Sequence, residues 1–148
     1  MRGKNTMKLE IAAVSENESF ARVAVAAFMT RLNPTLEELS DVKTAVSEAV
    51  TNAIIHGYKD RGGVIEIIAE LAENTVTVQV RDYGVGIADV FQAMQPFFTT
   101  QPEMERAGLG FAVMQTFMDM VHVDSKVGQG TTVRMVKNLK PIEDAVEQ

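Results

Sequence analysis

The sequence predicts an α+β fold: a two-layer α/β sandwich in which a mixed or antiparallel sheet carries helices on one face. Three observations lead to this expectation. The chain has 148 residues, enough for one domain with its own core. Segments with strand-like alternation and helical periodicity follow one another in the order β-α-α-β-β-loop-α-β-β. No internal repeat, low-complexity tract or long linker divides the chain. We therefore expect residues 1–148 to form a single domain, with a core over about residues 8–138 and flexible ends.

The N-terminal half contains one predicted strand and two predicted helices. Residues 8–14 alternate apolar and polar side chains, which indicates a strand. The S-x-x-E pattern from Ser15 to Glu18 is typical of a capping box and predicts a helix over 15–32. Thr35 to Glu38 repeats this pattern and predicts a helix over 35–56, after which Gly57 occupies the expected C-cap position.

The C-terminal half contains two predicted hairpins separated by a long loop and a helix. Strands are expected over 64–71 and 76–81, and again over 121–125 and 131–136 around a glycine-rich turn. Helical periodicity covers residues 109–118. Residues 82–107 are irregular in pattern, and a loop of that length in a small domain is usually functional or disordered.

Charge and composition exclude several classes of function. The net charge of −6 argues against direct nucleic-acid binding and against an anionic membrane surface, since both require a basic field. The absence of cysteine excludes disulfides and thiol catalysis. No apolar run reaches the length of about 20 residues that a membrane-spanning helix needs. The N-terminus lacks the apolar core of a signal peptide, so we expect a cytoplasmic protein without a membrane partner.

Two polar residues interrupt the apolar end of the predicted helix over 35–56. Glu48, Asn52 and His56 are spaced by four residues and form one stripe beside the buried face. From this helix alone, an exposed glutamate and a structural amide are the preferred interpretation. The alternative is a catalytic or metal-binding pair, for which Mg²⁺ is suited because it takes few oxygen ligands from protein. His56 is assigned no chemistry.

Two glycine motifs and one aromatic-threonine segment follow. Asp82-Tyr83-Gly84-Val85-Gly86 comes directly after a strand, and Asp82 could accept a hydrogen bond from a ligand amine or simply form a turn. Residues 106–110 (RAGLG) precede the helix over 109–118, where free amides would favour phosphate, although a tight loop joint is equally compatible. Residues 96–100 (PFFTT) could anchor a loop or present hydroxyls to phosphate. The usual P-loop, dinucleotide and protein-kinase signatures are absent.

Taken together, these motifs resemble the GHKL, or Bergerat-fold, ATP-binding domain of gyrase, the Hsp90 chaperone, histidine kinases and MutL. Residues 48–56 match its N box, 82–86 its first glycine box, 106–110 its second, and 130–132 its adenine-closing strand motif, so the resemblance spans about residues 8–138. EAVTNAIIHGY, PFFTT and ERAGLGF are most similar to bacterial anti-sigma serine kinases. Those of sporulation look nearest, and stress-response relatives share the motifs.

The resemblance implies ATP or ADP as cofactor and a role for each matching residue. Glu48 would be the general base, Asn52 a ligand of Mg²⁺ on the ATP phosphates, and Asp82 the acceptor for the adenine amino group. The remaining implied roles are Thr132 near adenine through water, Gly84 and Gly86 in the pocket wall, and a phosphate lid formed by Thr99, Thr100, Arg106, Gly108 and Gly110.

The implied partners are a sigma factor, with sporulation sigma-F expected, and an anti-anti-sigma protein phosphorylated on serine. A chain of this length has no room for a separate phosphoacceptor-histidine domain, so the substrate is expected in trans. A non-catalytic nucleotide-gated sigma-binding module, a stress-response kinase and a self-standing ATPase remain alternatives.

The helix over 15–32 has two apolar rows. One contains Phe20, Val23 and Ala27 and is expected to face the core. The other, Ala21, Val25 and Met29 with Arg22 beside it, is predicted to form the homodimer and sigma-binding surface. The alternative is a helix buried on both sides.

Overall fold

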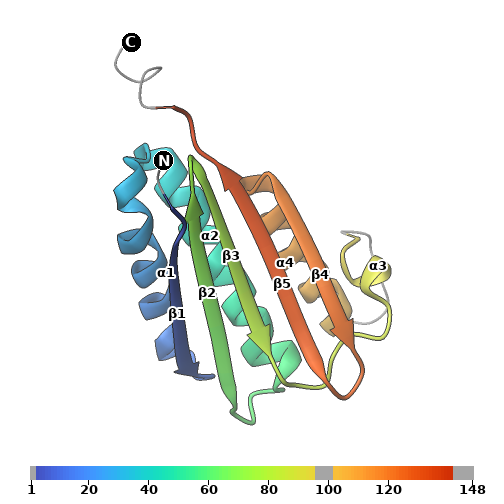
Figure 1. Ribbon diagram of the computed structural model, residues 1–148. Helices are drawn as coiled ribbons and strands as arrows, with labels where there is room; N and C mark the ends of the chain where they lie inside the picture. Colours follow the sequence, from blue (N-terminus) through green and yellow to red (C-terminus); the bar gives the residue numbers. More distant parts are fainter. Residues whose placement is uncertain (1–2, 96–101, 142–148) are drawn as a thin grey trace.

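The protein is a five-stranded sheet covered on one face by helices (Figure 1). The computed structural model describes residues 3–95 and 102–141, and for residues 102–108 it describes the backbone alone. Helices α1, α2 and α4 lie against the same face of the sheet, with α2 in contact with both of the others (Figure 1). The two-layer α+β architecture predicted from the sequence is therefore confirmed.

All pairings between the described strands are antiparallel. The spatial order is β1 (Asn5–Ala12), β2 (Val64–Ala72), β3 (Thr75–Asp82), β5 (Gly130–Asn138) and β4 (Met120–Lys126). The chain therefore passes from β3 to the edge strand β4 and returns through β5 to pair with β3. This return sets Asp82 at the end of β3 directly opposite Thr131 at the start of β5.

Alternation along the strands builds the core. The odd-numbered residues of β2 from Ile65 to Leu71 and the even-numbered residues of β3 from Val76 to Val80 are buried against the helices. α2 (Leu36–Asn52) buries the opposing row of Val42, Ala45, Val46, Ala49 and Val50. Two polar side chains at the edge of this core, Asp82 and Asn52, are consequently held between well-packed elements.

The orientation of α1 (Glu16–Met29) reverses the sequence expectation. Ala21, Val25 and Met29 have no exposed surface, whereas Phe20 and Val23 are 53% and 54% exposed. The row predicted to form a partner surface is thus the core row. The compact side chains of Ala21 and Val25 fit between α1 and its neighbours α2 and β2. The two rows of α1 have similar hydropathy, so the sequence alone does not show which row faces the core.

The two predicted capping boxes behave differently. Thr35 and Glu38 form theirs: the Thr35 amide donates to Glu38 Oε1 at 2.8 Å, and the Glu38 amide donates to Thr35 Oγ1 at 3.0 Å. Ser15 has helical backbone angles and makes no side-chain cap, so the box predicted from Ser15 to Glu18 does not form. A short 3₁₀ turn, η1 (Thr30–Leu32), extends α1 as far as predicted.

The end of α2 is a π-helical turn, η2 (Ala53–Gly57), rather than a glycine C-cap. The Tyr58 amide donates to the Ala53 carbonyl, five residues back, at 2.9 Å. Gly57 does not adopt the left-handed conformation that a C-cap requires. Single π-turns inside α-helices are frequent at functional sites.

The segment predicted to be irregular contains helix. α3 (Val90–Ala93) lies within it, and α4 (Pro102–Phe117) begins well before the predicted residue 109. The 106–110 motif therefore lies inside α4, which corrects the expectation that it precedes the helix and presents free N-terminal amides. Within the described chain, no helix is both long enough and apolar enough to span a bilayer.

Candidate functional site

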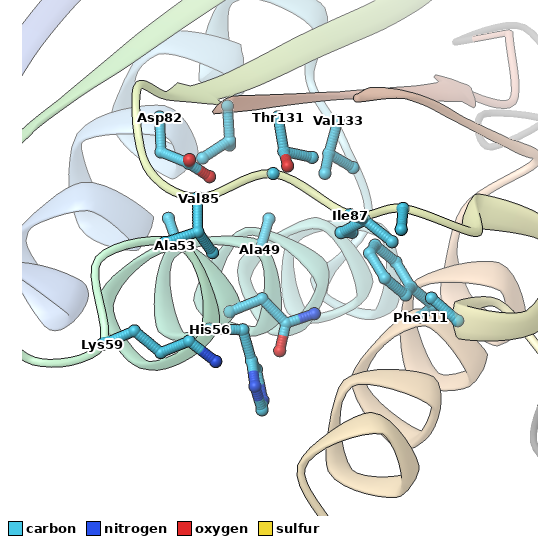
Figure 2. A pocket seen from close by; sticks show the side chains of 16 residues that line it. Ala49, Ala53, His56, Lys59, Asp82, Val85, Ile87, Phe111, Thr131 and Val133 are labelled. Atoms are coloured by element: carbon cyan, nitrogen blue, oxygen red, sulfur yellow. The ribbon is translucent and has the colours of Figure 1, made fainter. Parts of the chain in front are cut away.

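A cavity of about 200 Å³ lies where the C-terminal ends of α2 and β3 meet the start of β5. Ala49, Asn52, Ala53 and His56 line it from α2 and the π-turn, and Phe111 lines it from α4. Its other walls are Asp82, Thr131, Val133 and the segment 85–88 (Figure 2). The lining is largely apolar with a few polar groups, as in small-molecule sites. The volume is below the range of about 300–1,000 Å³ typical of whole-ligand pockets, so it suits one part of a larger ligand.

Asp82 provides the carboxylate of the cavity. It continues the inward row of β3 after Val76, Val78 and Val80, and it is 5% exposed. The Gly84 amide donates to Asp82 Oδ1 at 2.9 Å, and the Thr131 amide also donates to the carboxylate. Burial raises the pKa of Asp82, and these two amides oppose that rise. Asp82 lines the cavity, so its carboxylate can also accept a hydrogen bond from a ligand bound there.

The glycines around Asp82 are required by backbone packing. A Cβ on Gly57 would lie 2.8 Å from the Asp82 carboxylate, and a Cβ on Gly84 would collide with the Gly57 carbonyl. The Gly57 carbonyl accepts from the Val85 amide at 2.9 Å, so the π-turn and the glycine motif are joined. Gly86 lines the cavity with φ of +76°, and a Cβ there would meet the Lys126 carbonyl. Gly84 does not line the cavity; it packs against the Gly57 carbonyl.

Asn52 lies at the last residue of α2 and lines the cavity. Its Nδ2 is buried and finds no hydrogen-bond partner among the described residues. A Cβ on Gly110 would lie 3.0 Å from both polar atoms of the Asn52 side chain, so this glycine leaves the space that the amide occupies. A buried amide group without a partner costs about 1–3 kcal/mol, which a ligand bound in the cavity would offset.

Glu48 faces a different space from Asn52, although the two are one turn apart. It lines a groove of about 900 Å³ between α1 and α2, together with Arg22, Thr44, Ser47 and other residues of these helices. Glu48 is half-buried. A group at this position can reach a molecule that approaches from outside while the neighbouring Asn52 contacts one held in the cavity.

Thr131, and not Thr132, lines the cavity. Successive residues of β5 alternate between faces, so Thr131 and Val133 point toward the helices and Thr132 points to the opposite face of the sheet. The sequence placed Thr132 near adenine through water, and the structure corrects the position: Thr131 is the threonine that lines the cavity. The buried odd-numbered positions Val133 and Met135 on the same strand are the sequence signal that identifies Thr131.

Several predicted lid residues are not placed by the structure. Thr99 and Thr100 lie outside the described residues. Arg106 and Gly108 lie in α4, where only the backbone is described, so their proposed phosphate contacts remain predictions. Gly110 is the member of this group that the structure brings to the site.

His56, Lys59 and Phe111 are lining residues that sequence reasoning left without a role. In Figure 2, His56 and Lys59 lie toward the opposite side of the cavity from Asp82 and Thr131. Lys59 has φ of +54° in the turn after η2 and lines the cavity from there. The i+4 spacing from Asn52 places His56 on the cavity side, whereas the position of Lys59 depends on the π-turn and has no local sequence signal.

The donor set is suited to a metal held mainly by a ligand. Among the described residues there is no group of three or more histidine, cysteine or acidic side chains placed to bind a metal. One amide oxygen from Asn52 is compatible with Mg²⁺, which commonly takes one or two protein ligands and completes its shell with water and phosphate. A buried acceptor, Asp82, and an unpartnered amide, Asn52, in one largely apolar cavity fit a nucleotide with its base at Asp82 and its phosphates near Asn52.

Comparisons with known proteins give the family. A model of the histidine kinase-like ATPase domain matches residues 11–137. An anti-sigma F factor of Clostridium novyi is 57% identical over 140 residues, covering 94% of this chain and 98% of the relative. One from Thermoanaerobacter sp. is 58% identical over 133 residues, covering 90% and 93%.

Among solved structures, the blue-light activated histidine kinase of Erythrobacter litoralis EL346 superposes with a TM-score of 0.55 at 21% identity. The match covers 79% of this chain and 40% of that kinase, and it shows a shared fold. The extent and identity of these matches establish that the chain belongs to the anti-sigma F factor family and carries the histidine kinase-like ATPase domain.

Proposed function

We propose that this protein is an anti-sigma factor and an ATP-dependent serine kinase, which sequesters a sporulation sigma factor and phosphorylates a serine of its anti-anti-sigma antagonist. The observation that carries the proposal is the division of α2 between two spaces: Asn52 faces the cavity, and Glu48 faces the α1–α2 groove. This arrangement suits a kinase that acts on another protein, because the acceptor can approach Glu48 from outside while the nucleotide is held beside Asn52. The names and high identity of the relatives support the same function.

The cavity holds the nucleotide base in this proposal. The Asp82 carboxylate accepts from the adenine amino group, and the apolar side chains of Val80, Val133 and Phe111 exclude water from the ring. The cavity of about 200 Å³ leaves ribose and phosphates to extend past Asn52 toward α4. Base recognition thus comes from one charged hydrogen bond together with apolar burial.

Asn52 would hold Mg²⁺ through its amide oxygen, with its unpartnered Nδ2 available to a phosphate oxygen or water. When bound, the ion would neutralise charge on the phosphates, which is the main requirement of phosphoryl transfer. A nucleotide affinity that is equal with and without Mg²⁺ in wild type and in Asn52→Ala would contradict this role.

Glu48 acts as the general base on the acceptor serine. As the serine Oγ bonds to the γ-phosphorus, the bond between that phosphorus and ADP breaks, and the hydroxyl proton passes to the Glu48 carboxylate. The chain's other task is positioning: α2 holds Glu48 and Asn52 on adjacent turns of one rigid helix.

The test is transfer of phosphate from Mg-ATP to the anti-anti-sigma protein of a close relative, followed by intact mass. Glu48→Gln is expected to lower the transfer rate by about 10²–10⁴-fold, as for loss of a general base, with ADP affinity kept. Glu37→Gln makes the same change at an exposed position of α2 outside both spaces and serves as control. Transfer that persists in Glu48→Gln would refute the base assignment.

A non-catalytic module in which nucleotide only sets the sigma-binding conformation is the main rival. It predicts ADP and ATP binding without transfer to any partner. A self-standing ATPase instead predicts steady ADP release without a protein acceptor. The position of Glu48 in the α1–α2 groove favours the kinase over the non-catalytic module, which needs no base, and the protein acceptor in the assay separates the kinase from the ATPase.

We also propose a homodimer and a cytoplasmic location. The exposed row of α1 that contains Phe20 and Val23 is the apolar face available to a second copy or to the sigma factor. Arg22 borders the groove and pairs with Glu18 at 3.5 Å, so it remains a candidate contact for a partner. The mass of the purified chain in sedimentation tests the proposed homodimer. Recovery of the protein in the cytoplasmic fraction of lysed cells tests the proposed location.

A further inference from the structure

Ser125, in β4, makes contacts that determine how a residue of the cavity can bond. Its hydroxyl lies behind the cavity wall and does not line it. The Ile87 amide donates to Ser125 Oγ at 2.7 Å. Ser125 Oγ also lies 3.0 Å from the Gly130 carbonyl and 2.7 Å from Thr131 Oγ1. Three polar groups therefore surround one hydroxyl.

The single proton of Ser125 decides the direction of these bonds. A serine hydroxyl has one proton to donate and two lone pairs to accept with. The Gly130 carbonyl can only accept, so the Ser125 proton is donated to it. One lone pair is occupied by the Ile87 amide. The remaining lone pair faces Thr131, and the bond between the two hydroxyls is satisfied when Thr131 is the donor.

This direction fixes what Thr131 offers to a ligand. Its proton is committed to Ser125, so the lone pairs of Thr131 Oγ1 remain for the cavity. The adjacent Asp82 carboxylate also accepts. This end of the cavity consequently presents two acceptors, which match an exocyclic amino group with its two N–H bonds. A carbonyl oxygen in the same place would face acceptors alone.

We propose that Ser125 is a specificity-determining positioning residue, which holds Thr131 as an acceptor and so makes the cavity prefer a base bearing an amino group over one bearing a carbonyl oxygen. The inference rests on the proposed nucleotide site and adds a residue that acts on the base through another. When Ser125 is absent, the Thr131 hydroxyl turns and donates into the cavity.

The test compares the affinities of the full chain for ADP and for inosine diphosphate, in which a carbonyl replaces the amino group. Wild type is expected to prefer ADP. Ser125→Ala is expected to reduce that preference by about two- to tenfold, the worth of one hydrogen bond. Ser125→Thr retains the hydroxyl and is expected to retain the preference. Ser125→Cys, with a sulfur that is a weak acceptor, provides a second variant should Ser125→Ala not fold.

The preference ratio separates this role from a merely structural one. If Ser125 only anchors the loop through Ile87, both affinities fall together and the ratio is unchanged, which would overturn the inference. In a Thr131→Val background, Ser125→Ala is expected to leave the ratio unaltered, and a further change there would also overturn it. If wild type binds neither diphosphate, the proposed nucleotide function itself fails. Binding of ADP with a ratio insensitive to Ser125 refutes the present inference alone.

Discussion

Replacing Asp82 with asparagine separates the contribution of this carboxylate to binding from its effect on stability. The substitution keeps an oxygen at Oδ1 for the Gly84 amide, so the turn after β3 is expected to be preserved. It removes the charge and turns an NH₂ group toward the space where the base amino group is expected. Asp82→Asn is therefore expected to weaken nucleotide binding and to stabilise the protein without nucleotide.

The loss of affinity follows from the hydrogen bond removed. Hydrogen bonds to charged groups contribute about 1.5–3 kcal/mol, which corresponds to about ten- to hundredfold in dissociation constant. Asp124→Asn makes the same change in charge at an exposed residue of β4, where the carboxylate lies 3.2 Å from His122 Nε2. This control is expected to alter ADP affinity by less than about twofold.

The gain in stability depends on pH, and its sign follows from the raised pKa. Burial raises the pKa of Asp82 in the folded protein, whereas in the unfolded chain the group titrates in its ordinary range. Because the folded protein holds the proton of Asp82 more tightly than the unfolded chain does, protonated Asp82 favours folding at a pH below the ordinary pKa. This contribution to the free energy of unfolding is lost as the pH rises through the folded pKa. Asparagine does not titrate, so the advantage of Asp82→Asn grows across that interval and stays constant above it.

Urea unfolding without nucleotide, from about pH 4 to about pH 7.5, measures this difference directly. The denaturation midpoint of Asp82→Asn is expected to exceed that of wild type at neutral pH, with the gap narrowing as pH falls. A variant less stable than wild type by the same amount at every pH would refute the argument that the buried carboxylate is destabilising. Unchanged ADP affinity would refute its role in recognising the base.

Two further predictions concern residues for which sequence and structure differ. Thr131→Val is expected to weaken ADP binding by about two- to tenfold, the worth of one hydrogen bond. Thr132→Val, on the opposite face of β5, is expected to change ADP affinity by less than about twofold. If calorimetry shows the larger loss of ADP affinity in Thr132→Val, Thr132 and not Thr131 contacts the base. Phe20→Ser combined with Val23→Ser is expected to shift a dimer toward monomer in sedimentation equilibrium while ADP affinity and circular dichroism are kept. A dimer unaffected by both changes would exclude this face of α1.

Much of the site could be predicted because its signals are local. The positions of Asn52 near the end of a helix and of Asp82 at the end of a strand are visible in the sequence and hold in the structure, whereas Glu48 faces the α1–α2 groove instead of the cavity. The roles of the glycines were less accessible. The sequence suggested that Gly84 forms part of the pocket wall. The structure shows another reason for a glycine: a Cβ on Gly84 would collide with the carbonyl of Gly57, a residue 27 positions earlier in the chain.

The sequence by itself determined the periodicities, and with them the strands, the helices, the Thr35–Glu38 cap and the family, because these depend on residues close together in the chain. Only the tertiary structure decided which partners those elements take. The pairing of β3 with β5 places Thr131 beside Asp82, and the close approach of α1 buries Val25 and exposes Phe20. Both outcomes depend on packing between distant segments, where two faces of similar hydropathy differ in shape, and shape is not written in local sequence.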